Sequence, residues 1–345
     1  MASKTKHGDS TRFIQSRAML PLGLIIGLGL LVLCLAWSIT LGAAEISLST
    51  IWDSIFAFDD SSFQHLVIQT VRLPRVVAGA LVGASLAVAG AIMQGLTRNP
   101  LASPSILGVN AGAAFAVVLT VFILGSPPLS VYSIAAFIGA GVASVLVYAL
   151  GSMGRSGATP LKLTLVGAVF TAFVSSFTTA LLVTSQDTLD QIRFWTVGSL
   201  AGRDWALFTQ TAPYMLVGLI GALLLARQIT TISLGEDIAT GLGQNTLIVK
   251  GLAAIVVVLL AGGGVALAGP IGFVGLVAPH IVRFIVGQDY RWILPYCALV
   301  GGAMVILGDM AARIIIRPQE LPVGVMMALI GAPFFIYLAR WKLER

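Results

Sequence analysis

Long runs without a single charged residue are the feature that most restricts how this chain can fold. A helix that crosses the roughly 30 Å of hydrocarbon in a bilayer needs about 20 consecutive apolar residues. Only 10% of the residues are charged, against about 25% in a typical soluble domain. This composition predicts an all-α polytopic membrane protein, because a membrane β-barrel would show short alternating segments instead. Uncharged runs of sufficient length lie at 18–44, 76–97, 163–186, 205–226 and 321–339.

Two longer apolar stretches contain residues that break helices. Gly125-Ser-Pro-Pro128 divides the first stretch, and Gly269-Pro270 divides the second. We therefore expect ten transmembrane helices, an even number that places both termini on one side of the membrane. The five further spans lie near 106–124, 131–151, 247–268, 271–287 and 292–312.

Basic residues are distributed unevenly along the chain. The positive-inside rule places Lys and Arg preferentially in cytoplasmic segments. With the N-terminus inside, 14 of the 20 basic residues fall on the cytoplasmic side, and most acidic residues fall outside. The net charge of +6 thus follows from topology rather than from nucleic-acid binding. The predicted parts are a cytoplasmic tail at 1–17, a ten-span domain at 18–341 with a cytoplasmic loop at 228–250, and a cytoplasmic end at 342–345.

A polar segment, Gln228–Lys250, separates two of the apolar spans. Ser233 and Glu236 have the spacing of a capping box, in which both side chains satisfy free N–H groups at a helix start. Glu236 and Asp237 fall in the first turn, where negative charge suits the helix dipole. The segment predicts a short helix at the membrane surface, which is either the contact site for a soluble partner or a connector without one.

Glycines mark the expected end of this short helix. Gly241 and Gly243 are placed to end it, because glycine adopts the left-handed conformation that closes many helices. Asn245 or Thr246 suits the start of the next helix, since either side chain accepts a hydrogen bond from a free N–H. The predicted order is a short helix, a tight break and a membrane helix.

Ionisable residues within the predicted spans are few. We interpret His280 as satisfying backbone groups freed by Pro279, and Arg283 as extending to the inner interface. Contact with a substrate is the alternative for both residues. Asp309 and Arg313 have the i, i+4 spacing of a helical ion pair, so we expect Asp309 to orient Arg313.

The chain lacks the motifs of common enzymes. It has no Walker A loop and no HExxH, and its two cysteines have no metal-ligand spacing. We therefore expect no catalytic residues, no metal and no cofactor. An ion-coupled secondary transporter would need carboxylates in mid-span, and only Asp309 comes close. An intramembrane hydrolase would have only His280 as a base.

Several short motifs occur in order along the chain, and together they resemble the FecCD-type permeases. These are the membrane subunits of type II ABC importers for ferric siderophores, haem and vitamin B12. The resemblance runs from about residue 18 to the C-terminus. The motifs are Arg72-Leu-Pro-Arg75, Met93–Ala102, Pro104–Gly112, Leu234–Ala239, Gly269–Arg283, Gly308–Arg313, Glu320–Gly324 and Gly331–Ile336.

The resemblance implies a permease subunit in a bacterial plasma membrane that pairs with an identical or paralogous permease around one translocation path. Two cytoplasmic ATP-binding subunits hydrolyse ATP, and an extracytoplasmic substrate-binding protein delivers the cargo. A ferric siderophore is the expected cargo, with vitamin B12 or haem as alternatives. In this family the loop between spans six and seven contacts the ATPase. The coupling residues implied here are Ser233, Gly235, Glu236, Asp237, Gly241 and Gly243.

Arg72, Arg75 and Arg313 lie at the outer ends of spans, against the positive-inside trend. The resemblance implies that they dock carboxylates of the binding protein, with the guanidiniums of Arg72 and Arg75 directed outward. Lipid phosphates, or nearby Asp59 and Asp60, are the alternative partners. The resemblance also points to span five, span ten and the segment 187–204 as lining the path. The path residues expected are Thr164, Thr171, Ser175, Thr178, Thr179 and Val325.

Overall fold

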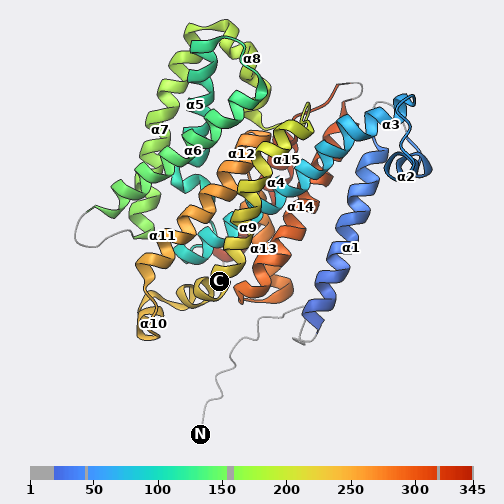
Figure 1. Ribbon diagram of the computed structural model, residues 1–345. Helices are drawn as coiled ribbons and strands as arrows, with labels where there is room; N and C mark the ends of the chain where they lie inside the picture. Colours follow the sequence, from blue (N-terminus) through green and yellow to red (C-terminus); the bar gives the residue numbers. More distant parts are fainter. Residues whose placement is uncertain (1–18, 43–45, 154–158, 317–318, 344–345) are drawn as a thin grey trace.

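The computed structural model describes residues 19–42, 46–153, 159–316 and 319–343. In these ranges the chain is a bundle of helices without strands, as predicted (Figure 1). Seven described helical segments are long and apolar enough to cross a membrane, and α5, α13 and the first part of α15 are shorter apolar helices. Together they match the ten predicted spans. The spans are α1 (Met19–Thr40), α4 (Leu73–Thr97), α5 (Val109–Leu124), α6 (Leu129–Ser152), α7 (Pro160–Thr184), α9 (Trp205–Leu234), α11 (Thr246–Val257) with α12 (Gly263–Ala268), α13 (Val274–Val286), α14 (Tyr290–Ile315) and α15 (Val323–Leu343).

Short helical elements connect or extend the spans. The short elements are α2 (Leu48–Phe56), α3 (Phe63–Val67), α8 (Gln186–Val197), α10 (Glu236–Gly241), the π-helical turns η1 (Ile68–Arg72) and η3 (Val258–Gly262), and the 3-10 turn η2 (Pro104–Leu107).

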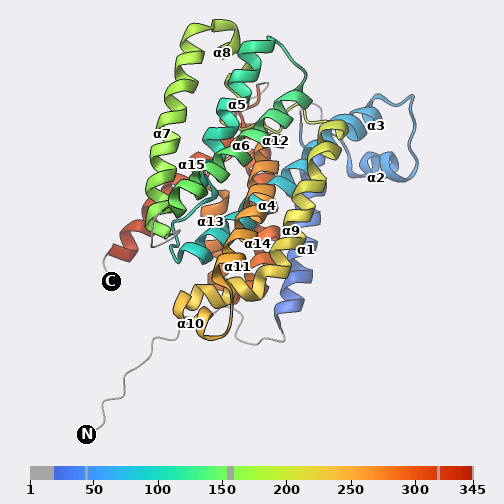
Figure 2. The same ribbon diagram turned by 60° about the vertical axis from the view of Figure 1, so that its left-hand side comes forward.

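The helix α4 lies at the centre of the bundle. In the most apolar 18 residues of the continuous helical segment Phe63–Thr97, which contains α4, 78% of the residues are buried, against 6% for α1 and 11% for α7. α1 lies at one edge, and α5, α6 and α7 form a group at the opposite side (Figures 1 and 2). The outer faces of α1 and α7 are therefore left for lipid or for another subunit.

Glycines bring the backbone of α4 into direct contact with its neighbours. A Cβ atom on Gly83 would lie 2.2 Å from the carbonyl oxygen of Gly301 on α14. A Cβ atom on Gly90 would lie 1.9 Å from the carbonyl oxygen of Gly275 on α13. Small residues at such crossings let membrane helices approach closely enough for their backbones to pack. The position of α4 thus depends on the absence of side chains at these two crossings.

We expect Gly90→Ala to lower the free energy of unfolding by about 1–3 kcal/mol, because the added Cβ forces two backbones apart. Thermal unfolding of the purified protein in detergent measures this effect. Gly29→Ala is the matched control, since Gly29 on α1 has nothing within 4 Å of an added Cβ. Equal melting temperatures for the two variants would contradict the packing role of Gly90.

Candidate functional site

The two ends of the bundle carry different polar structures. One end carries α10 and the start of α1, and we call it the α10 end (Figure 1). The opposite end carries α2, α3 and α8, and we call it the α8 end (Figure 2).

The junction between α9 and α10 differs from the predicted one. α9 continues to Leu234, beyond the predicted limit at residue 226, because no glycine or proline follows that limit before Gly235, which has a φ of +142°. The first part of the segment 228–250 is therefore helix rather than loop. Ser233 lies within α9, and its hydroxyl donates to the carbonyl oxygen of Thr230 (2.6 Å). The predicted capping box is wrong, because Gly235 precedes α10 and has no side chain to act as a cap.

Glu236 has a different role from the one predicted. It does lie in the first turn of α10, together with Asp237, as expected. Its carboxylate, however, accepts hydrogen bonds from Lys250 Nζ (2.7 Å) and Thr246 Oγ1 (3.3 Å) on α11. The hydrogen bond from Lys250 lowers the pKa of the Glu236 carboxyl below its usual value. Glu236 thus ties the start of α10 to the start of α11.

The predicted end of α10 is confirmed. α10 ends at Gly241, and Gly243 adopts the left-handed conformation with φ of +79°. The N–H groups of Gly243 and Gln244 return to the carbonyl oxygens of Thr240 and Ala239 (2.9 and 3.0 Å), which is the Schellman pattern of helix closure. Asn245, rather than Thr246, caps α11 by accepting from the Ile248 N–H (3.2 Å).

α10 has one buried face and one exposed face. Ala239 packs against Ile232 of α9 and Val249 of α11, with Leu96 of α4 beside them. On the other face, Ile238 and Leu242 are 51% and 71% exposed. An apolar surface on a helix held by three others is the kind of surface that a protein partner can cover.

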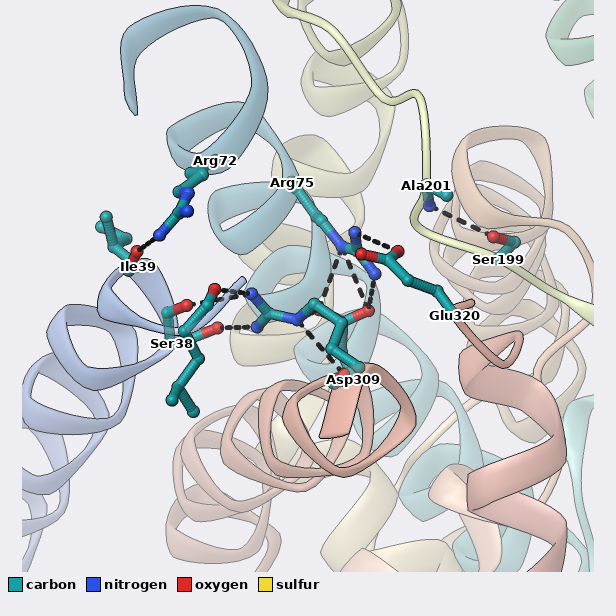
Figure 3. Close-up of polar contacts among 10 residues, drawn as sticks. Ser38, Ile39, Arg72, Arg75, Ser199, Ala201, Asp309 and Glu320 are labelled. Carbon is teal, nitrogen blue, oxygen red and sulfur yellow. Dashed lines mark hydrogen bonds and ion pairs between the residues drawn. The ribbon is translucent and has the colours of Figure 1, made fainter. Parts of the chain in front are cut away.

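The arginines at the α8 end are engaged within the chain. Arg72 donates to the carbonyl oxygens of Ile39 (2.6 Å) and Thr40 (3.2 Å) at the end of α1 (Figure 3). Arg313 donates to the carbonyl oxygens of Ser38 (3.0 Å) and Leu41 (2.7 Å). Both residues are only 7% exposed. The expected outward direction is wrong for Arg72, because the free carbonyl groups at the end of α1 draw its guanidinium inward, and wrong for Arg75, whose guanidinium is held by Asp309 and Glu320.

Asp309 and Arg75 complete this group of charges. The Asp309 carboxylate pairs with Arg75 (2.8 Å) and with Arg313 (3.1 Å), so it does orient Arg313 as predicted. Arg75 also pairs with Glu320 (2.7 Å), whose side chain is 37% exposed (Figure 3). Arg203, which the sequence did not single out, is also buried at this end, and burial lowers the pKa of its guanidinium to about 10.

Some of the expected path residues line a groove on α7. Thr164 and Thr171 share an open groove of about 450 Å³ with Ser105 of η2 and Asn110 of α5. Asn110 was missed, although it is the one amide side chain in its apolar run. Three other expected residues of α7 continue the same helical stripe but do not line the groove: Ser175, Thr178 and Thr179. Val325 does not line the groove either.

Arg283 does not extend to a membrane interface as expected. Its guanidinium donates to Gln94 Oε1 (2.5 Å) and to the Tyr290 hydroxyl (3.2 Å) inside the bundle. His280 is buried nearby on α13, with its ring 5.2 Å from that of Phe284. Gln94 lies within a predicted apolar span and Tyr290 just before one, so only the presence of Arg283 indicated polar partners.

Similarity to known proteins extends over nearly the whole chain. Residues 30–341 match the FecCD transport family. The chain is 47% identical over 319 residues to the iron(3+)-hydroxamate import system permease protein FhuB of Bacillus subtilis (strain 168), covering 92% of this chain and 82% of that protein. It is 39% identical over 327 residues to the ferric enterobactin transport system permease protein FepD of Escherichia coli (strain K12), covering 95% and 96%. A solved structure described as an inward-facing conformation of a metal-chelate type ABC transporter superposes with a TM-score of 0.82 at 31% identity, covering 93% of this chain and 99% of that chain. The chain therefore belongs to the FecCD transport family.

Proposed function

We propose that this chain is the permease subunit of an ATP-driven importer for an iron chelate, with a ferric siderophore as the cargo. Relatives described as permeases for iron(3+)-hydroxamate and for ferric enterobactin support an iron chelate. A relative described as a hemin permease, from Yersinia pestis and 37% identical over 330 residues, keeps haem as the alternative cargo. The structural observation that carries the proposal is α10, a short, exposed helix held rigidly between two spans.

The proposed orientation places the α10 end in the cytoplasm. The distribution of basic residues supports it. In this orientation the exposed face of α10 meets a separate ATP-binding subunit, which hydrolyses the ATP. The proposed coupling residues shape α10 and its two junctions. They are Ser233 and Gly235 before the helix, Glu236 and Asp237 in its first turn, and Gly241 and Gly243 at its end.

We expect Leu242→Asp to weaken binding of the ATP-binding subunit roughly tenfold or more, equivalent to ~1.4 kcal/mol. The side chain is exposed in the permease alone, so the charge enters only the proposed interface. Co-purification of the two subunits and ATP-dependent uptake of a ferric hydroxamate into proteoliposomes measure the effect. Leu242→Met is the control and should behave as wild type. Normal binding and uptake by Leu242→Asp would refute the contact at α10, and uptake driven by an ion gradient without the ATPase would favour a secondary transporter.

We also propose that the polar stripe of α7 faces a translocation path between two permease subunits. The groove beside Thr164 and Thr171 supports this, because it carries hydroxyl and amide groups without a fixed charge. α7 leaves most of its surface uncovered within one subunit, as a helix at a subunit interface would. Ser175, Thr178 and Thr179 continue the stripe, and Val325 on α15 is the proposed facing position.

Cysteine accessibility tests the path in a variant whose native Cys34 and Cys297 have been replaced. We expect Ser175→Cys and Val325→Cys to react with a water-soluble thiol reagent at rates that change with the nucleotide state. Ile25→Cys is the control, because Ile25 is 68% exposed on α1 at the edge of the bundle and should face lipid. Reaction rates that are equally low at all three positions in every state would contradict the proposed path.

We further propose that the substrate-binding protein docks at the α8 end. Arg72, Arg75 and Arg313 were expected to meet its carboxylates, and their burial restricts how this can occur. Arg75 is the member of the group whose partner, Glu320, is substantially exposed. A carboxylate on the docked protein would therefore compete with Glu320 for Arg75.

We expect Glu320→Gln to tighten docking about two- to fivefold, because it removes a competitor whose ion pair with Arg75, solvated on the Glu320 side, is worth ~0.2–1 kcal/mol. The dissociation constant of the binding protein on reconstituted transporter is measured at low and high salt, and the gain should shrink as salt screens the charges. Asp60→Asn removes an exposed charge from the same end and serves as the control. Equal tightening by both variants would show a general charge effect and would contradict the role of Arg75.

A further inference from the structure

A hydrogen-bonded cluster of four side chains crosses the bundle near its α10 end. The Arg283 guanidinium on α13 donates to Gln94 on α4 (2.5 Å) and to the Tyr290 hydroxyl at the start of α14 (3.2 Å). The backbone N–H of Tyr290 donates to Thr230 Oγ1 on α9 (3.0 Å). One residue from each of four helices thus joins the cluster.

The cluster is fixed by shape as well as by hydrogen bonds. Gln94 and Tyr290 are 3% and 2% exposed. Gln94 Nε2 donates to the carbonyl oxygen of Gly275 in the first turn of α13 (3.2 Å). A Cβ atom on Gly95 would lie 2.7 Å from the Tyr290 hydroxyl oxygen, so a glycine is needed to admit the tyrosine. A charged donor makes stronger hydrogen bonds than a neutral one, and Arg283 therefore holds its partners in one arrangement.

On one side the cluster is connected to α10. Thr230 lies one turn before Leu234, the last residue of α9. The same turn contains Ile232, which packs against Ala239 of α10. The side-chain amide of Gln244, three residues after the end of α10, donates to the carbonyl oxygen of Gln228 (3.1 Å). A displacement of α10 must therefore move the last turns of α9.

On the other side the cluster is connected to the start of α13 and to α15. Gly275 lies two residues after Phe273, which has a φ of +66°. This is a strained conformation for a bulky residue, and only firm surrounding contacts maintain it. Phe273 packs against α15, where a Cβ atom on Gly331 would lie 2.4 Å from the Phe273 Cβ. The contacts thus run without a gap from α10 to α15.

We propose that Arg283 is a positioning residue that transmits movement of α10 to the start of α13 and on to α15. This inference rests on the proposed function, in which α10 receives that movement from an ATPase. Unbroken contacts alone do not establish energetic coupling between two sites. The test therefore measures coupling and not only stability.

The test compares two substitutions on α14, each of which removes the hydroxyl group of one tyrosine. Tyr290→Phe removes the bond to Arg283. Tyr296→Phe is the matched control, because that hydroxyl bonds the carbonyl oxygen of Leu20 (2.8 Å) and is buried but outside the cluster. Both variants are reconstituted with the ATPase and the binding protein, and the number of ferric hydroxamates imported per ATP hydrolysed is measured. We expect this ratio to fall roughly fivefold or more in Tyr290→Phe, at the lower end of allosteric couplings, and to stay unchanged in Tyr296→Phe.

A purely structural role for the cluster would lower the amount of active transporter and leave the ratio unchanged, and that result would overturn the proposal. If Tyr290→Phe fails to assemble, Thr230→Val replaces it as the test variant, with Thr211→Val as the matched control. Both threonines lie on α9 and donate to a carbonyl oxygen four residues back. A wild-type transporter without ATP-dependent uptake would instead refute the proposed function, and this inference with it.

Discussion

No water lies in the hydrocarbon of a bilayer to bond a free backbone N–H or C=O, so each such group needs a partner within the protein. Helices meet this need along most of the chain, and tertiary contacts meet it where helices break. After α12 the Ala268 carbonyl oxygen accepts from the Ser199 N–H (2.7 Å), and the Gly198 carbonyl oxygen accepts from the Gly324 N–H (3.0 Å). A Cβ atom on Gly324 would lie 1.8 Å from the Val197 carbonyl oxygen. The end of α8, the break after α12 and the start of α15 therefore depend on one another.

The same need explains why charge is buried at the α8 end. Arg72 and Arg313 satisfy carbonyl groups at the end of α1, and Asp309 lies between Arg75 and Arg313. Removing Asp309 would leave two buried guanidiniums without their shared counter-ion, a situation that is strongly unfavourable. At the opposite end α10 itself is held differently, by helix caps, by the bond from Lys250 to Glu236 and by a small apolar cluster beneath the helix. Its outer face is thus free to contact another subunit without loss of internal bonds.

Much of the fold followed from simple patterns in the sequence. Uncharged runs gave the spans, because a charge within hydrocarbon is costly wherever it occurs. Gly269-Pro270 predicted a break, and Gly243 and Asn245 predicted the end of α10 and the start of α11. These predictions held because such residues act on the backbone conformation of their immediate neighbours. The capping box at Ser233 failed because its spacing fits equally well inside a helix that continues. α9 ends only at Gly235, because few residues other than glycine tolerate its φ of +142°.

The sequence by itself thus determined that the chain spans a membrane about ten times, where several of its helices break, and to which family it is similar. The tertiary structure decided which polar residues are used internally. The side chains of Arg72, Arg283 and Glu236 each bond a partner far along the sequence, 33, 189 and 14 residues away respectively. Hydrogen bonds across such separations depend on how helices pack, and that packing depends on glycine contacts such as Gly90 against Gly275. A local pattern cannot specify such partners, because it carries no information on which helix faces which.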